Sequence, residues 1–308
     1  MSLFHPPKEI QTEIFSQLPE KFWKNGDSDW VRANKPGQKI TSFLEGPSFD
    51  QEGNLYVTDI PYGRIFKISP QGEWNLVTEY DGWPNGLKIH KDGRIFIADY
   101  KNGIMLLDPQ SGQVLPFLTH RKSEGFKGVN DLFFSKEGKL YFTDQGQTGM
   151  HDPTGRVFSY DLKTEHLECL INNAPSPNGL VMDLEEKALF VGMTRGNAVW
   201  RLPILKDGTT SKVGTFTSLA GGLSGADGLA IDAESNLYVC DAGHACVWVF
   251  NKYAEPLYRI KACTTGRTIT NLAFGGLNNN QLFIIDSSTG SVLTTTLKHY
   301  GKPMFSHH

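Results

Sequence analysis

The chain has 308 residues, of which 39% are hydrophobic and 20% are charged, and its formal net charge is −3. This composition is ordinary for a globular protein with a large core. The nearly balanced charge, without a basic block, argues against nucleic acid as a partner. No apolar run approaches the roughly 20 residues of a membrane-spanning helix, so we expect no membrane partner either.

The N-terminal residues lack a basic segment followed by an apolar one, so no secretory signal is predicted. The four cysteines, at positions 169, 240, 246 and 263, show no CxxC spacing. We therefore expect unpaired, buried cysteines in a reducing compartment and a cytoplasmic protein.

Short strand-like runs separated by Gly, Asn, Asp and Pro fill the chain, and six of its segments resemble one another. These segments are EGPSFDQEGNLYVTD from Glu45, NGLKIHKDGRIFIAD from Asn85, NDLFFSKEGKLYFTD from Asn130, NGLVMDLEEKALFVG from Asn178, DGLAIDAESNLYVCD from Asp227 and NLAFGGLNNNQLFIID from Asn271. Their first residues are 40, 45, 48, 49 and 44 positions apart. A period of about 45 residues made of short strands predicts an all-β fold, a six-bladed β-propeller with four-stranded blades, forming a single domain over residues 1–308.

The individual blades can be followed in chain order. The N-terminal run Thr12–Leu18 is predicted to supply the outer strand of the sixth blade, which closes the ring and removes exposed sheet edges. The segment 19–44 is then expected to cross one face as a lid or wall. The first blade is predicted as strands 46–49, 55–58, 64–68 and 74–78, and the sixth as strands near 282–285 and 291–295.

Each repeat opens on a polar residue at the start of the innermost strand. Because strands alternate in direction within a blade, these residues must lie on one face, around the mouth of the central channel. They are Glu45, Asn85, Asn130, Asn178, Asp227 and Asn271. The loops between the second and third strands end on the same face, so the ring forms the floor of a pocket and the loops form its wall.

Two carboxylates and four amides that converge on an axis make an oxygen-rich site, which suits Ca²⁺. Zn²⁺ prefers His or Cys, and neither belongs to the ring. The alternative is that Asn and Asp only satisfy turn backbones, which is a sufficient explanation for Asn85 and Asn271. It does not suit Glu45, because Glu is a poor turn residue.

The motifs EGPSFDQEGNLYVTDI, GVNDLFFSKEGKLYFTD, SPNGLVMD and GADGLAID resemble those of the gluconolactonase, regucalcin and luciferin-regenerating-enzyme-like propellers. The resemblance implies one divalent cation, Ca²⁺ first, with Mg²⁺, Mn²⁺ or Zn²⁺ as alternatives. It places the metal ligands at Glu45, Asn130, Asn178 and Asp227, and Asn130 is alternatively a substrate or water contact. The regucalcin type carries an Arg two residues before the third-blade Asn, where this chain has Gly128.

The resemblance also implies hydrolysis of a small-molecule lactone, with the carbonyl polarised by the cation and Asp227 and Asn130 as catalytic residues. A metal-bound hydroxide and the loop histidines His151 and His244 are alternative bases. Asn85, Trp30, Trp83, His151 and His244 are expected to contact substrate. An apolar wall that included Trp30 and Trp83 would suit a lactone less polar than a sugar lactone.

Two other functions remain open at this stage. One is a phosphotriesterase-like hydrolase on the same metal floor, and the other is a non-enzymatic propeller that binds a ligand or a protein. The converging carboxylates argue against the second. The protein is expected to be a monomer or a small homo-oligomer.

Overall fold

The computed structural model describes residues 6–24, 26–223 and 225–307. Parts of two predictions lie outside these ranges. They are residues 1–5 and 308 of the predicted domain, and residue 25 of the predicted lid. No helix in the described part of the chain is long and apolar enough to cross a membrane. All four cysteines are free, and Cys240 and Cys246 are buried, but Cys169 is half-buried and Cys263 is exposed, so the expectation that all four would be buried is wrong for these last two.

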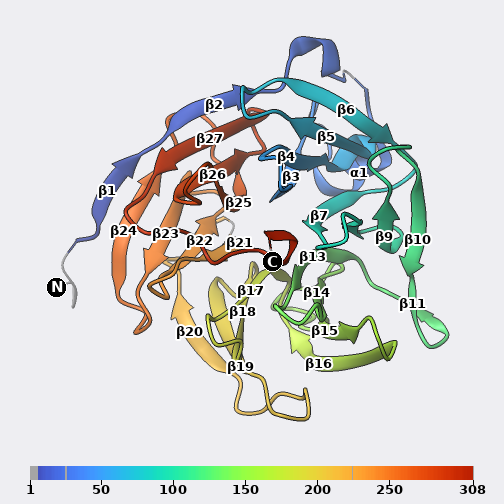
Figure 1. The fold of residues 1–308 in the computed structure, drawn as a ribbon, viewed down its shortest axis with the longest axis vertical. Helices are drawn as coiled ribbons and strands as arrows, with labels where there is room; N and C mark the ends of the chain where they lie inside the picture. Colours follow the sequence, from blue (N-terminus) through green and yellow to red (C-terminus); the bar gives the residue numbers. More distant parts are fainter. Residues whose placement is uncertain (1–5, 25, 224, 308) are drawn as a thin grey trace.

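Six sheets surround a central channel, as Figure 1 shows, and each sheet forms one blade of a β-propeller. Blade 1 contains β3 (Leu44–Phe49), β4 (Leu55–Asp59), β5 (Arg64–Ile68) and β6 (Trp74–Glu79), and blade 2 contains β7 (Pro84–Ile89), β8 (Ile95–Asp99), β9 (Gly103–Leu107) and β10 (Val114–Leu118). Blade 3 contains β13 (Val129–Phe134), β14 (Leu140–Asp144), β15 (Gly155–Asp161) and β16 (His166–Ala174), and blade 4 contains β17 (Pro177–Met182), β18 (Ala188–Met193), β19 (Ala198–Pro203) and β20 (Gly214–Ser218). The six-bladed fold predicted from the repeat period is confirmed.

The last two blades recruit strands from the N-terminal end of the chain. Blade 5 contains β21 (Ala226–Ile231), β22 (Leu237–Asp241), β23 (Cys246–Phe250) and β24 (Pro256–Lys261), and blade 6 contains β25 (Ile269–Gly275), β26 (Gln281–Asp286) and β27 (Ser291–Thr296). The strand β2 (Glu13–Gln17) pairs antiparallel with β27, which confirms the predicted closure of the ring. The strand β1 (Lys8–Gln11) pairs in parallel with β24 as a fifth strand of blade 5, which the sequence did not predict.

The remaining elements are short. They are η1 (Glu20–Phe22), α1 (Asp29–Asn34), η2 (Ile60–Tyr62), the hairpin β11 (His120–Arg121) with β12 (Glu124–Gly125), and η3 (Phe305–His307). The helix α1 begins at the N-cap Ser28, whose hydroxyl accepts a hydrogen bond from Val31 N, as N-cap serines do.

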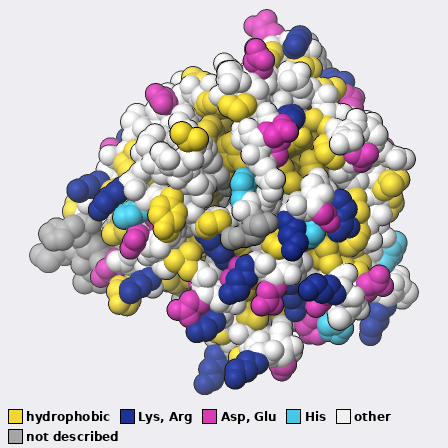
Figure 2. Space-filling model, viewed as in Figure 1, with side chains coloured by type: hydrophobic (Ala, Val, Ile, Leu, Met, Phe, Trp, Pro, Cys, Tyr) yellow, Lys and Arg dark blue, Asp and Glu magenta, His cyan; other side chains and the backbone are white. Residues whose placement is uncertain are grey.

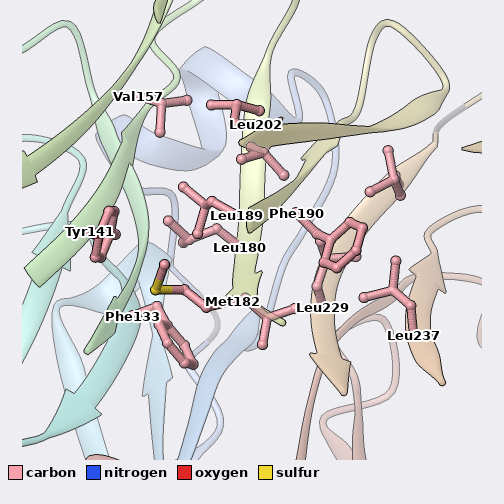
Figure 3. Close-up of a cluster of buried hydrophobic side chains, with 14 of the residues drawn as sticks. Phe133, Tyr141, Val157, Leu180, Met182, Leu189, Phe190, Leu202, Leu229 and Leu237 are labelled. Atoms are coloured by element: carbon pink, nitrogen blue, oxygen red, sulfur yellow. The ribbon is translucent and has the colours of Figure 1, made fainter. Parts of the chain in front are cut away.

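The hydrophobic core lies between neighbouring blades. Figure 3 shows the cluster where blades 3, 4 and 5 meet, with Phe133, Leu180, Met182 and Leu229 directed toward one another. Because the side chains of a strand alternate between its two faces, each blade presents one apolar face to each neighbour. Burial of these faces supplies the main driving force for the stacking of the blades.

The C-terminal segment lies over one mouth of the central channel (Figure 1). It is anchored by Lys302, whose Nζ donates to Glu186 Oε1 at 2.8 Å and to the carbonyl of Asp183 at 3.0 Å. Figure 2 shows this face, where basic and acidic side chains are interspersed around the centre.

Every innermost strand carries a β-bulge at nearly the same point. In β7, for example, the ladder to β8 shifts between Pro84 and Leu87, four other inner strands shift at the equivalent place, and β3 shifts one residue later, between Glu45 and Ser48. The Asn-Gly pair at 85–86 is therefore a bulge within a strand and not a hairpin turn. A bulge bends the strand, and here it directs the side chain of the first of its two residues to the mouth of the channel.

Glycine follows the ring residue in four of the six blades because the inner strands approach one another closely here. A Cβ added to Gly46 would lie 2.3 Å from the carbonyl oxygen of Asn85, and one added to Gly179 would lie 2.5 Å from that of Asp227. Backbone atoms cannot yield as a flexible side chain can, so only glycine fits.

Replacing Gly46 with Ala is expected to lower the free energy of unfolding by at least about 2 kcal/mol more than the same change at Gly93. Both glycines have a positive φ, +57° and +88°, so both variants carry a similar backbone cost. Only Gly46 has backbone atoms in the space of the new Cβ, whereas Gly93 has open space. Urea unfolding of the two variants measures the difference, and equal losses would show that the close approach does not matter.

Candidate active site

The floor of a cavity of about 760 Å³ is formed by the ring residues at the channel mouth opposite the C-terminal segment. Glu45, Asn85, Asn130, Asn178 and Asp227 line it, each as the second residue of an innermost strand. All five side chains are buried. The structure thus brings together all four predicted metal ligands and the predicted substrate contact Asn85.

The sixth ring position is Thr270 and not Asn271. The bulge of β25 falls between Ile269 and Leu272, which aligns Thr270 with the other ring residues and Asn271 with the position after them. The sequence alignment was one residue out in this blade, because the sixth repeat has one residue more before its second strand. Thr270 lines the cavity, whereas Asn271 lies below the floor.

A second polar layer lies beneath the ring, formed by Asp131 and Asn271 of the opposite blades 3 and 6. The Asn271 side-chain Nδ2 lies 3.3 Å from Asp131 Oδ2 and 3.0 Å from Glu45 Oε2, so it donates to two carboxylates. The other four blades have glycine at this level, and a Cβ on Gly86 or Gly228 would lie 2.3 Å from Asp131 Oδ1 or Asn271 Oδ1. The glycines therefore leave room for two side chains to meet across the channel.

Sequence reasoning missed Asp131, although a signal was present. Four repeats read Asn-Gly, Asp-Gly or Glu-Gly at this point, and only the third reads Asn-Asp. An acidic residue in a position that otherwise requires glycine has to project into the channel.

The hydrogen bonds around the floor orient its amides. Asn130 Nδ2 donates to Gln145 Oε1 at 3.0 Å, and Asn178 Nδ2 donates to Thr194 Oγ1 at 3.1 Å. Both NH₂ groups thus bond to the protein wall, and the amide oxygens remain available to a ligand. Glu45 Oε2 accepts from the backbone N–H of Gly46 at 3.0 Å in addition to Asn271.

Two oxygens of the floor are buried and have no hydrogen-bond donor among the described residues: Asn130 Oδ1 and Asp227 Oδ1. A buried polar atom without a partner is costly, and a native site of this kind requires a further group. A hard divalent cation would satisfy both oxygens. In the described part of the chain no three His, Cys, Asp or Glu side chains gather as a metal site; the floor instead combines two carboxylates with amides.

Burial and mutual repulsion shape the electrostatics of the floor. Burial, with the Asp131 charge adding to it, raises the pKa of the Glu45 carboxyl to about 7. The pKa of Asp227 is raised well above its ordinary value, first by burial and then by the charges of Glu45 and Asp131. Three buried carboxylates in one channel repel one another, and a cation would relieve this repulsion.

Buried aspartates at the ends of the second strands position the floor. Asp59 Oδ1 accepts from Phe43 N at 2.7 Å, and Asp144 Oδ1 accepts from Gly128 N at 2.8 Å. Each bond fixes the backbone two residues before a ring residue. Asp59 is itself held by Arg64, whose Nε lies 2.8 Å from Asp59 Oδ2.

The wall combines the predicted segment 19–44 with the loops of blades 2 to 4. From the segment, Trp30, Asn34, Lys35 and Phe43 line the cavity, and from the loops His151 does so. The wall also contains Tyr100, Gln145, Thr148 and Arg195, which lie in the loops between second and third strands that were predicted to form it. The sequence did not indicate which individual side chains of these loops face the cavity.

Two predicted substrate contacts do not line this cavity. The Trp83 ring is half-buried against Tyr100, with the ring centroids 6.2 Å apart. His244 Nδ1 lies 3.0 Å from both carboxylate oxygens of Asp241, which holds the ring outside the cavity wall. The role of each in binding substrate stays a prediction.

Comparison with known proteins supplies sequence and fold relatives. A family model described as the SMP-30/Gluconolactonase/LRE-like region matches residues 43–288. The lactonase drp35 of Staphylococcus epidermidis is 31% identical over 242 residues, which cover 75% of this chain and 72% of that protein. The lactonase drp35 of Staphylococcus aureus strain USA300 is 31% identical over 240 residues, with the same coverage.

Two solved structures show the same fold. A calcium-binding protein, regucalcin, from Agrobacterium tumefaciens superposes with a TM-score of 0.77 at 16% identity, covering 98% of this chain and 100% of that chain. A gluconolactonase from Xanthomonas campestris superposes with a TM-score of 0.73 at 20% identity, covering 84% and 87%.

The metal-free protein is expected to lose stability as pH rises from about 5 to 8. The pKa of Glu45 is about 7 in the fold, against about 4.3 in an unfolded chain, so the native state binds more protons in this window. Stability then falls with pH by at most about 1.4 kcal/mol per pH unit for this one group. Urea unfolding in the presence of a chelator measures the slope.

The variant Glu45→Gln removes this titrating group and is the matched comparison. It is expected to reduce the slope, because its amide carries no charge at any pH in the window, and the raised pKa of Asp227 accounts for a remaining slope of the same sign. A slope unchanged by this substitution would show that Glu45 is ionised throughout.

Proposed function

Because the chain belongs to the SMP-30/gluconolactonase/LRE-like family, we propose that it is a metal-dependent hydrolase that opens the ester bond of a small lactone. The observation that carries the proposal is a pair of buried oxygens, Asn130 Oδ1 and Asp227 Oδ1, which have no hydrogen-bond partner in the described part of the chain and lie in the floor of a cavity of about 760 Å³. Such a floor suits a cation, and a cavity of this size suits a small-molecule substrate. The names of the lactonase drp35 relatives support the same reaction class.

Glu45, Asn130, Asn178 and Asp227 would hold the cation, and Ca²⁺ is the first choice because all four donate oxygen. When bound, the cation polarises the lactone carbonyl and stabilises the negative charge that develops on its oxygen. Asn271 and Gly46 hold the Glu45 carboxylate, while Gln145 and Thr194 hold the two amides. These contacts preorganise the floor before substrate arrives.

Asp227 takes the proton from the attacking water in this proposal. Its Oδ1, which accepts no hydrogen bond from the described residues, would face the cation, so the water proton is received on the other carboxylate oxygen. Asn130 is the neighbouring polar group and orients the water or the substrate through its amide oxygen. The proton then passes to the ring oxygen of the lactone, which leaves as a hydroxyl while the carbonyl carbon becomes a carboxylic acid, and this acid ionises to a carboxylate by releasing the second water proton to solvent.

Acid release from a lactone panel on a pH-stat should stop when a chelator is added and return when Ca²⁺ is restored. We expect this loss because none of the side chains in the floor can replace the cation in polarising the lactone carbonyl. Hydrolysis that continues in the chelator would contradict metal dependence. Hydrolysis of organophosphorus esters without any lactone opening would favour the phosphotriesterase alternative.

The substitution Asp227→Asn should lower kcat/KM for the best lactone by at least about 100-fold, the ordinary contribution of a general base. Asp207→Asn is the matched control, because that carboxylate is exposed and bonds only to Thr209 within its own turn. Calcium titration of both variants separates loss of the base from loss of the cation. Full activity in Asp227→Asn would exclude this residue as the base.

A further inference from the structure

Gly128 lies at a point where two blades meet, and its backbone is fixed. Its N–H donates to Asp144 Oδ1 at 2.8 Å, and its carbonyl accepts from the backbone N–H groups of Gln145 at 2.8 Å and Gly146 at 3.2 Å. A Cβ at position 128 would lie 2.6, 2.7 and 2.8 Å from three ring atoms of Tyr100. The backbone cannot move aside, so a side chain here and the observed position of the Tyr100 ring exclude each other.

Tyr100 is held from three sides. Its backbone N–H donates to the carbonyl of Trp83 at 3.0 Å, its ring packs against the Trp83 ring, and its hydroxyl accepts from Gln147 Nε2 at 2.8 Å. The hydroxyl hydrogen itself has no acceptor in the described ranges. The ring therefore adds to the cavity wall an aromatic surface with a single hydrogen-bond donor.

One side of the cavity wall carries an apolar cluster. Trp30, Phe43 and Ile60 line it from α1, the following segment and η2, and they form this cluster with Trp83. Tyr100 packs against the cluster through Trp83 and extends the apolar surface into blade 2. Polar side chains also line the cavity: Asn34 and Lys35 beside the cluster, and Thr148, His151 and Arg195 in the loops of blades 3 and 4, with Met150 among them.

We propose that Tyr100 is the specificity-determining residue of this cavity, and that Gly128 is required to give its ring room. The ring selects lactones that carry an apolar chain or ring over polyhydroxylated sugar-acid lactones. An apolar substituent would bury surface against Tyr100, whereas the hydroxyls of a sugar would lose water there and find only one donor. This inference rests on the proposed lactonase function and names its substrate class.

The test compares two lactones of equal ring size, a six-membered lactone with an alkyl chain and a six-membered sugar-acid lactone, both with Ca²⁺. In the wild type, kcat/KM is expected to be higher for the alkyl lactone. Tyr100→Ala should lower that value about tenfold, mainly through KM, and leave the sugar lactone within about threefold. Tyr100→Phe keeps the ring and should retain the preference, and Gly128→Ala should shift it in the same direction as Tyr100→Ala because it displaces the ring.

Tyr253→Phe is the control, since this side chain is largely exposed and lies away from the cavity. The ratio between the two substrates is the deciding readout, because a purely structural role would lower both values together. An unchanged ratio in Tyr100→Ala, or an equal loss for both lactones, overturns the inference while the lactonase function stands. Failure of the wild type to open either lactone overturns the proposed function as well.

Discussion

Six strands converge on one axis in this molecule, and at one level the space between their backbones has room for the side chains of Asp131 and Asn271 but not for six side chains. Four blades meet this constraint with glycine, and every blade meets it with a bulge. The bulge pushes the preceding residue to the channel mouth, so the packing of the inner strands and the construction of the floor have the same cause. A polar residue at that position therefore faces the equivalent residues of the other five blades, independently of the sequence of the other strands in its own blade.

The same constraint concentrates charge. Glu45, Asp131 and Asp227 are all buried around the channel, and the amide of Asn271 bridges the first two. Such an arrangement is unfavourable without a compensating group, because charged oxygens have been taken out of water. The fold tolerates it because the surrounding blades bury large apolar faces, so the stability of the core supports an unfavourable floor.

The sequence was sufficient for the parts of the structure that repeat. The spacing of the six segments predicted the blades, the ring positions of five of them and the closure by 12–18, because each depends on a local pattern recurring with a fixed period. The alignment of the repeats failed at Asn271, because the sixth repeat is irregular there. It also overlooked Asp131, whose only signal was that the third repeat has an acidic residue where four other repeats have glycine. The strand β1 and the pairing of Gly128 with Tyr100 depend on contacts between distant segments, and no periodicity encodes those.

The closure of the ring has a consequence for how the chain folds. Glu13 pairs with Thr294, and Lys8 pairs with Tyr258, so β1 and β2 find their partners only in the last two blades of the propeller. Contacts this far apart in sequence carry a high entropic cost of loop closure and slow the closing step of folding. Until β24 and β27 have formed, the N-terminal strands have no sheet edge to pair with and the ring stays open. The partly formed propeller is therefore most vulnerable to aggregation just before these strands pair, while unpaired edges are still exposed.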